Sequence, residues 1–145
     1  MIQRKQSLFL LVASLGFWSL FKLPFASSNK IASPFFEDQL LNINDHVILL
    51  VLCILGGVLT AATILLFNNR KLQLRLGILN IIFSLFLIVV ALWVVFSKAP
   101  SIDSTIDISD NIGLYMPLLS FICVVLANYF IKKDDNLVRS ADRLR

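Results

Sequence analysis

The sequence predicts an all-α membrane protein in which an antiparallel four-helix bundle crosses the bilayer and both termini face the cytoplasm. Two observations lead to this fold class. Hydrophobic residues make up 58% of the 145 positions and charged residues only 15%, whereas about 25% of the residues in a typical soluble domain are charged. The apolar residues also gather in four long runs, which is typical of membrane spans. A chain of this length forms one domain.

Four segments are long and apolar enough to cross the bilayer as helices. They are residues 7–25, 47–67, 76–96 and 113–131, each of 19 or 21 residues. At a rise of 1.5 Å per residue, each segment covers about 30 Å, the thickness of the hydrocarbon core. Because backbone polar groups cannot remain unpaired in lipid, runs of this length must be helical. Short connections favour antiparallel packing of consecutive helices.

The first run also fits a secretory signal peptide. Two basic residues precede it, and the small residues 26–28 follow it, as in a cleavable leader. However, the run is longer than the usual apolar core of a leader, and Pro24 disfavours cleavage after Ala26. We therefore expect a retained first span, with cleavage as the alternative.

The distribution of basic residues predicts the orientation. Ten of the 13 basic residues lie before the first run, between the second and third runs, or after the fourth. They are Arg4, Lys5, Arg70, Lys71, Arg75, Lys132, Lys133, Arg139, Arg143 and Arg145. The other two connections, 26–46 and 97–112, are acidic. Since short cytoplasmic segments carry the excess of Lys and Arg, both termini should be cytoplasmic.

The two acidic connections are expected to form short irregular or part-extended caps at the outer end of the helices. In the second connection, residues 102–108 alternate apolar and polar side chains, which is a weak strand pattern. The apolar residues of the first connection that could cover the helix ends are Phe35, Phe36, Leu40, Leu41 and Ile43.

Small and polar residues within the runs are candidates for interhelical packing. They are Gly56, Gly57, Thr60, Asn80, Ser84 and Asn128. Small residues one turn apart let two helix backbones approach closely in lipid. We expect the amides of Asn80 and Asn128 to hydrogen-bond between helices, at about 0.6–2 kcal/mol each. The alternative for these amides is a polar passage for a transported substrate.

The tail, residues 132–145, is expected to form a short amphipathic cytoplasmic helix that extends the fourth span or lies along the headgroups. Its bases and those between the second and third runs suit contact with a protein partner or with anionic lipid. The residues assigned to this contact are Arg70, Lys71, Arg75, Lys132, Lys133, Arg139, Ser140, Asp142 and Arg143. The alternative is a solvated tail that only sets the topology.

No catalytic, metal-ligating or cofactor-binding residues are predicted. An enzyme needs titratable groups that converge in one pocket, and the apolar runs contain only Lys22, at an edge. His46 is the sole histidine, and a zinc site rarely rests on one histidine, so we expect it to be solvated at the interface. Cys53 and Cys123 lie in apolar runs, where cysteine behaves as a small hydrophobe. Topology explains the net charge of +4, so no nucleic-acid partner is expected.

Several segments resemble an uncharacterised four-span inner-membrane protein family of Bacteroidota, known only as a domain of unknown function. The resemblance rests on residues 128–145 (NYFIKKDDNLVRSADRLR) together with residues 1–4 at the start. Residues 67–75 (FNNRKLQLR) and 79–80 resemble the family's cytoplasmic connection and the opening of its third span. The tail residues that match the family pattern are Arg139, Ser140, Asp142 and Arg143. The resemblance implies an inner-membrane location and a retained first span, but no reaction.

We therefore expect a non-enzymatic accessory or structural protein of the bacterial inner membrane that docks with a larger membrane assembly. Its expected partners are the lipid bilayer and another membrane protein or complex; the sequence does not predict the number of copies. The alternative function is a small oligomeric transporter or channel. Ion-coupled carriers usually have ionisable residues at mid-membrane and broken helices, and the sequence shows neither.

Overall fold

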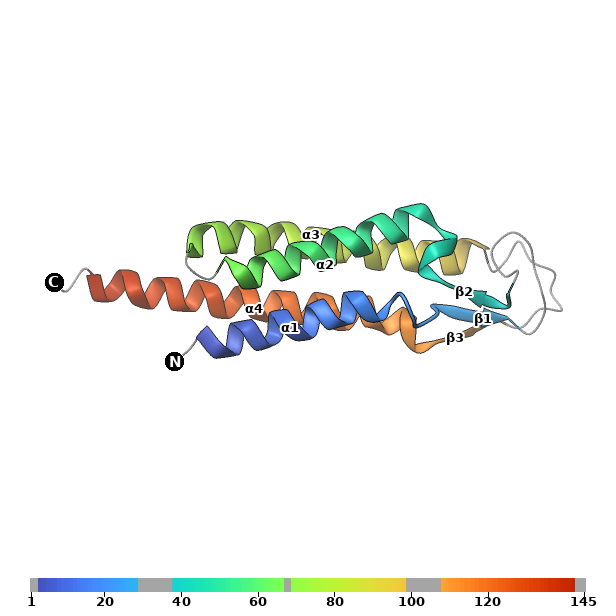
Figure 1. Cartoon of the computed structure of the whole chain (residues 1–145), viewed down its shortest axis with the longest axis horizontal. Helices are drawn as coiled ribbons and strands as arrows, with labels where there is room; N and C mark the ends of the chain where they lie inside the picture. Colours follow the sequence, from blue (N-terminus) through green and yellow to red (C-terminus); the bar gives the residue numbers. More distant parts are fainter. Residues whose placement is uncertain (1–2, 29–37, 67–68, 99–107, 143–145) are drawn as a thin grey trace.

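Four long helices and a small sheet make up the computed structural model, which describes residues 3–28, 38–66, 69–98 and 108–142. In chain order the elements are α1 (Gln3–Ser19), β1 (Ala26–Ser28), β2 (Leu40–Leu41), η1 (Ile43–Asp45), α2 (Val47–Leu65), α3 (Arg70–Lys98), β3 (Ile108–Asp110) and α4 (Ile112–Asp142). The helices lie side by side along the long axis of the molecule, and the strands meet at one end (Figure 1). The predicted all-α architecture is therefore confirmed in its helical part, and the sheet adds to it.

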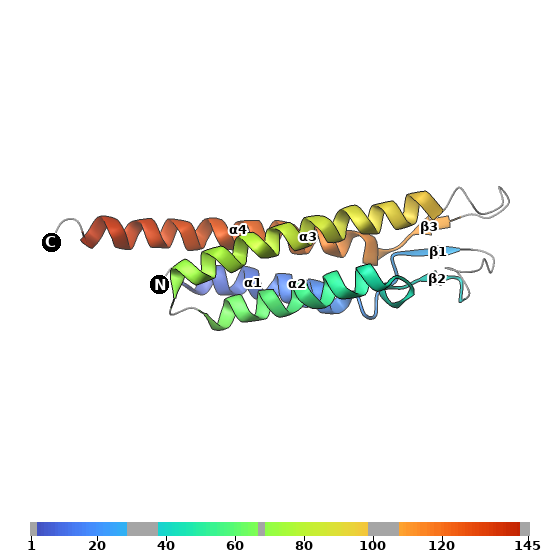
Figure 2. The ribbon, with the colours of Figure 1, turned by 90° about the horizontal axis from the view of Figure 1, so that it is seen from above.

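Each helix packs against two others. α1 contacts α2 and α4, and α3 contacts the same two helices. Consecutive helices run in opposite directions, so the start of α1 and the end of α4 lie at the same end of the molecule, away from the sheet (Figures 1 and 2). We call these two ends the helix-terminal end and the sheet end.

A repeating spacing of buried residues explains how the helices pack. On α3 the buried positions follow alternating intervals of four and three: Gln73, Gly77, Asn80, Ser84, Leu87, Ala91 and Val94. On α2 the same spacing joins Leu49, Cys53, Gly56, Thr60 and Thr63. An average interval of 3.5 residues keeps one narrow face of a helix against its neighbours and is typical of knobs-into-holes packing. On α2 and α3 the buried face therefore follows a regular spacing and includes polar as well as apolar residues.

Three helices of the described part are long and apolar enough to cross a membrane. They are Val47–Leu65, Arg70–Phe96 and Ile112–Val138. Only 33% of the most apolar stretch of each is buried inside the protein, so most of its residues are at least partly accessible at the surface. Such an exposed apolar surface is unfavourable in water and suits acyl chains. The structure therefore supports the prediction of a membrane protein.

α1 is shorter than the apolar run that predicts the first span. It has 17 residues, about 26 Å by the usual helical rise, and it ends at Ser19 although the run continues to residue 25. The N–H groups of Lys22 and Leu23 both bond to the carbonyl of Ser19, which tightens the last turn. Pro24 then disfavours helical geometry at the residue before it, and the chain continues into β1.

The sheet joins the two connections at this end of the molecule: β1 and β2 lie between α1 and α2, and β3 lies between α3 and α4. Its order is β2-β1-β3, and β1 pairs antiparallel with both neighbours. Beside it, the N–H of Phe25 bonds to the carbonyl of Leu41 at 2.8 Å, and the N–H of Gly113 bonds to the carbonyl of Pro24 at 3.1 Å. Leu41 and Ile43 are buried in the main hydrophobic cluster, as expected for residues that cap the helices. Leu40, also predicted to cap the helices, is instead exposed. The remaining predicted cap residues, Phe35 and Phe36, and residues 102–107 of the weak strand pattern lie outside the described residues.

α3 and α4 extend beyond the apolar runs 76–96 and 113–131. The side-chain Oδ1 of Asn69 accepts the N–H of Leu72 at 3.3 Å, the usual arrangement at a helix N-cap, so α3 begins six residues before its run. α4 continues without interruption to Asp142 and projects past the other helices (Figures 1 and 2). The described part of the tail is therefore a continuation of α4.

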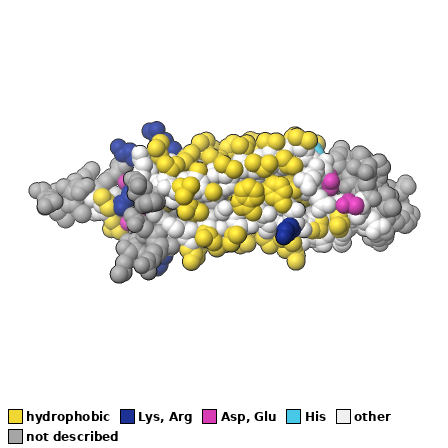
Figure 3. Space-filling model, viewed as in Figure 1, with side chains coloured by type: hydrophobic (Ala, Val, Ile, Leu, Met, Phe, Trp, Pro, Cys, Tyr) yellow, Lys and Arg dark blue, Asp and Glu magenta, His cyan; other side chains and the backbone are white. Residues whose placement is uncertain are grey.

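Charged side chains occupy the two ends of the molecule and leave an apolar belt between them. Figure 3 shows this belt, with basic side chains mainly at the helix-terminal end and acidic ones at the sheet end. All four tryptophan and tyrosine residues of the chain are exposed and lie toward the ends of the apolar runs: Trp18, Trp93, Tyr115 and Tyr129. Such residues are enriched where a protein meets the membrane interfaces.

Candidate functional site

The helix-terminal end gathers basic side chains from three helices. Lys5 lies in the first turns of α1, Lys71 and Arg75 in those of α3, and Lys132 and Lys133 near the end of α4, and all five are exposed. Sequence reasoning assigned four of them to partner or lipid contact, and the fold brings these four to one end. The structure adds Lys5 to the same surface.

Arg70, assigned to the same contact, is engaged within the protein. Its guanidinium lies 3.3 Å from the Asp134 carboxylate and donates a second bond to the Asp134 carbonyl at 3.3 Å. These contacts join the start of α3 to α4. Both side chains are partly exposed, with 28% and 14% of their surfaces accessible to solvent. Arg70 therefore fixes the position of the projecting part of α4.

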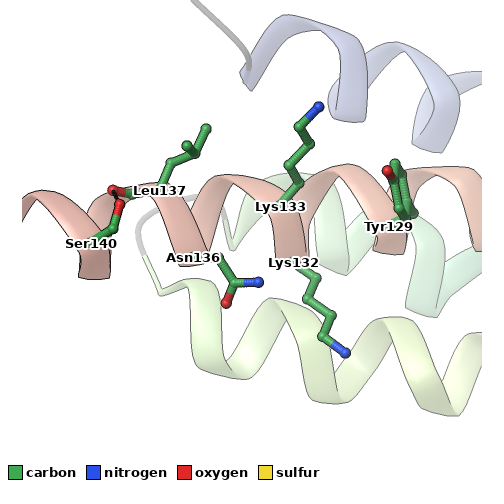
Figure 4. A pocket seen from close by; sticks show the side chains of 6 residues that line it. All are labelled: Tyr129, Lys132, Lys133, Asn136, Leu137 and Ser140. Carbon is green, nitrogen blue, oxygen red and sulfur yellow. Dashed lines mark hydrogen bonds between the residues drawn. The ribbon is translucent and has the colours of Figure 1, made fainter.

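A shallow hollow of about 570 Å³ follows this part of α4. It is lined by Tyr129, Lys132, Lys133, Asn136, Leu137 and Ser140 (Figure 4). Lys132 and Lys133 point to opposite sides of the helix (Figure 4), so the hollow carries a cation on each flank. The hydroxyl of Ser140 donates to the Leu137 carbonyl at 2.8 Å. Of the remaining tail residues assigned to contact, the side chains of Arg139 and Asp142 and the whole of Arg143 lie outside the described part.

In the interior, the predicted packing glycines bring α1 against α2. A side-chain carbon at Gly56 would lie 2.6 Å from the ring of Phe17, and one at Gly57 would lie 3.3 Å from the ring of Trp18. The thiol of Cys53, one turn before Gly56, donates to the Phe17 carbonyl at 3.1 Å. Gly56 therefore lies at a close approach between two helices.

A polar cluster joins α2, α3 and α4 in the half of the interior nearer the helix-terminal end. The amide of Asn80 donates to the Thr60 hydroxyl at 2.6 Å, and Thr60 donates to the Gly56 carbonyl at 2.6 Å. One turn away, the amide of Gln73 donates to the Thr63 carbonyl at 3.1 Å. The amides therefore link α3 to α2.

Asn128 joins the cluster from α4. Its amide packs against the backbone of Gly77, where a side chain would otherwise lie. The serine predicted for packing, Ser84, donates a hydrogen bond within its own helix, to the Ile81 carbonyl at 2.9 Å. Instead, Ser120 links two helices by donating to the Ala13 carbonyl at 3.3 Å.

Among the described residues of this half of the protein, four buried amide oxygens have no hydrogen-bond partner. They are Oε1 of Gln6, Oε1 of Gln73, Oδ1 of Asn80 and Oδ1 of Asn128. Gln6, Gln73 and Asn80 are 4%, 1% and 0% exposed. Sequence reasoning missed Gln6 and Gln73 as interior residues because they lie outside or at the edge of the apolar runs. The four-and-three spacing that links Gln73 to Gly77 and Asn80 would have placed it on the inner face.

The residues with metal-binding or redox chemistry lie apart from one another. Among the described residues, no group of three or more His, Cys, Asp or Glu side chains is close enough to hold a metal ion. His46 precedes α2, and its ring lies edge-on to Trp93 at a centroid distance of 6.5 Å. Cys53 and Cys123 are both buried and free.

Comparison with known proteins identifies a family whose function is unknown. The model of one family, described as a domain of unknown function (DUF4293), matches residues 2–144. No curated protein and no solved structure matches the chain.

Proposed function

Since the chain belongs to this family of unknown function, DUF4293, we propose its role from the surface it presents: a four-span accessory protein of the bacterial inner membrane. In this proposal the protein is non-enzymatic and docks with a larger membrane assembly through its helix-terminal end. That end lies in the cytoplasm together with both termini.

The surface of α1 supports a fourth span. α1 buries Leu10, Ala13 and Phe17 against its neighbours. Its opposite face consists of exposed apolar side chains at helical spacing: Leu8, Leu11, Leu15 and Trp18. A helix that is apolar on both its inner and outer faces suits lipid on the outer one. Although α1 itself is about 26 Å long, the turn that follows it extends the crossing.

The separation of charge supports the orientation. The exposed bases at the helix-terminal end face Asp38, Asp45 and Asp110 at the sheet end, across the apolar belt (Figure 3). Cytoplasmic segments of membrane proteins carry the excess of Lys and Arg. The test uses a chain in which both native cysteines are replaced by alanine and one cysteine is added, as Ser109→Cys or Asn136→Cys. In intact cells a membrane-impermeant thiol reagent should label the first and spare the second; the reverse pattern would overturn the orientation.

The observation that carries the docking proposal is the projecting part of α4. Leu137 and Val138 are 48% and 41% exposed there, beside the two lysines that flank the hollow. Exposed apolar residues with charged residues beside them are typical of a contact surface. The ion pair between Arg70 and Asp134 holds this surface in a fixed position relative to the membrane helices.

A photo-crosslinking amino acid placed at Asn136 or Ser140 of the full-length protein tests the docking in cells. We expect one dominant crosslinked protein from both positions. The same group at Ser109, at the sheet end, is the matched control and should not give that product. Absence of any protein adduct from the two α4 positions, with adducts to lipid only, would refute docking with a protein assembly.

The four buried amide oxygens favour a second candidate, a small oligomeric transporter or channel. Polar groups inside membrane helices are costly and often mark a path for a solute. Liposomes that contain only the purified protein distinguish the two candidates. A solute flux that Asn80→Leu abolishes would support transport, whereas impermeable liposomes would leave the accessory role.

A further inference from the structure

The four unpaired amide oxygens between the helices are all hydrogen-bond acceptors. An unpartnered buried carbonyl costs about 1–3 kcal/mol, and a site inside the membrane offers few alternative partners. The described residues of one half of the protein contain four such groups. We propose that Gln73, Asn80 and Asn128 form a binding site for a small monovalent cation around Gly77.

The backbone of α3 places the three amides along one side of the helix, within about 10 Å of one another along its axis. Gln73 precedes Gly77 by one turn and Asn80 follows it by almost one turn, so all three lie on one face of the helix. The Asn128 amide lies against Gly77 from α4, between the other two. The two amides of α3 are held by their NH₂ groups, which donate to Thr63 and Thr60 of α2. Their oxygens are thereby left available to a ligand.

The fourth oxygen belongs to the same half of the interior. Phe9 of α1 stacks on Phe130 of α4 at a centroid distance of 5.5 Å, and Gln6 lies one turn before Phe9. Because α1 and α4 are antiparallel, Gln6 lies further toward the helix-terminal end than the Asn128 level. It extends the row of acceptors toward the solvent at that end.

The donor set indicates the class of ligand. The side-chain atoms that the structure leaves unpaired here are neutral oxygens. A water molecule offers as many acceptors as donors, whereas alkali and ammonium ions offer positive charge alone and suit a set of acceptors. Divalent cations usually require carboxylates, and none of the three amide positions supplies one. Neutral carbonyl oxygens can replace the hydration shell of a monovalent ion inside a membrane.

The residues along the inner face of α3 indicate from which side the ion enters. Toward the sheet end, the inner face continues with Leu87, Ala91 and Val94, which are buried and apolar. Toward the helix-terminal end it continues with Gln73. The least exposed base described at that end, Arg70, is paired with Asp134, so its charge is compensated. Gln73 and Gln6 are themselves buried, so an ion would enter from the helix-terminal end past their amides, and the apolar residues close the site toward the sheet end.

Thermal unfolding of the purified full-length protein in nanodiscs tests the proposal. Potassium, sodium and ammonium chloride are titrated against choline chloride at equal ionic strength, because choline is too large for the site. A ligand that binds the native state raises the melting temperature in a saturable manner. We expect such a rise for at least one of the small ions, and its loss in Asn80→Leu. Ser84→Ala is the control, because Ser84 lies on the same inner face of α3 but bonds within its own helix. This variant should keep the rise in melting temperature.

A second variant covers the case in which Asn80→Leu does not fold. Gly77→Ala retains all three amides, but its new carbon would displace the Asn128 amide that lies against Gly77, and it should also abolish the rise. Equal melting temperatures in choline and in all small cations would overturn the proposal and would leave the amides hydrated by water only. A rise that persists in both variants would overturn it as well. These results are independent of crosslinking at α4, so the site and the docking role fail separately.

Discussion

Replacement of Gly56 by alanine tests whether the close approach of α1 and α2 organises the fold. The added carbon would lie 2.6 Å and 2.8 Å from two atoms of the Phe17 ring. Phe17 is 0% exposed and belongs to the main hydrophobic cluster, so the ring has no free space to enter. Overpacking of this kind typically costs about 1–3 kcal/mol.

The adjacent glycine supplies a matched control. A carbon at Gly57 would lie 3.3 Å from Trp18, whose side chain is 48% exposed and can move outward by a few tenths of an ångström. Both replacements gain the same helix propensity, about 1 kcal/mol for Gly→Ala, so this term cancels in the comparison. Gly56→Ala should therefore be less stable than Gly57→Ala by about 1–3 kcal/mol, or about 5- to 150-fold in the unfolding equilibrium constant.

Equilibrium unfolding in mixed micelles, followed by far-ultraviolet circular dichroism, measures this difference. The signal avoids the fluorescence of Trp18, which the control variant itself disturbs. Phe17→Leu in the Gly56→Ala background should recover part of the loss, because a smaller side chain relieves the contact, and the double-mutant cycle isolates that coupling. Equal stabilities of the two alanine variants, or no coupling to Phe17, would refute the reasoning.

Three further changes probe the sheet end and the helix-terminal end by the same unfolding measurement. Gly113→Ala should destabilise the protein by about 1–3 kcal/mol, because the new carbon would meet the backbone carbonyl of Pro24, which cannot rotate away. A neutral effect would show that the segment before β1 and the start of α4 are not in contact there. Leu41→Ala, at a residue only 1% exposed, should cost about 2–5 kcal/mol, and a loss below about 1 kcal/mol, less than a buried leucine gives, would place this cap outside the core. Arg70→Gln should cost no more than about 1 kcal/mol, since partly exposed ion pairs contribute little, but it should reduce protease resistance beyond Asp134; unchanged cleavage would argue against the role of the pair in holding α4.

The sequence could not reveal the end of α1. Its apolar run continues to residue 25, and hydrophobicity alone does not distinguish a helix from the turn that follows Ser19. The boundary depends on Pro24 and on hydrogen bonds to β2 and α4, which are about 15 and 90 positions away in the chain. Long-range pairing therefore overrode the local pattern.

The interior polar cluster shows the same division. Asn80 and Asn128 stood out in the sequence because polar residues are rare in apolar runs, and the prediction that Asn80 bonds between helices agrees with its contact to Thr60. Gln73 did not stand out, since it lies among charged and polar neighbours. Its spacing from Gly77 and Asn80 is consistent with an inward position, but the packing of α3 against α2 and α4 shows which partner its amide meets.

Composition and spacing determined by themselves that this chain has long apolar helices and that its basic residues gather toward one side, because the length of a membrane span and the distribution of charge are local properties of the chain. The tertiary structure decided which faces of the helices meet, which amides remain with unpaired oxygens and where α1 ends. These features arise from contacts between residues far apart in the sequence. Their free energies depend on distances of a few ångströms, which no local pattern contains.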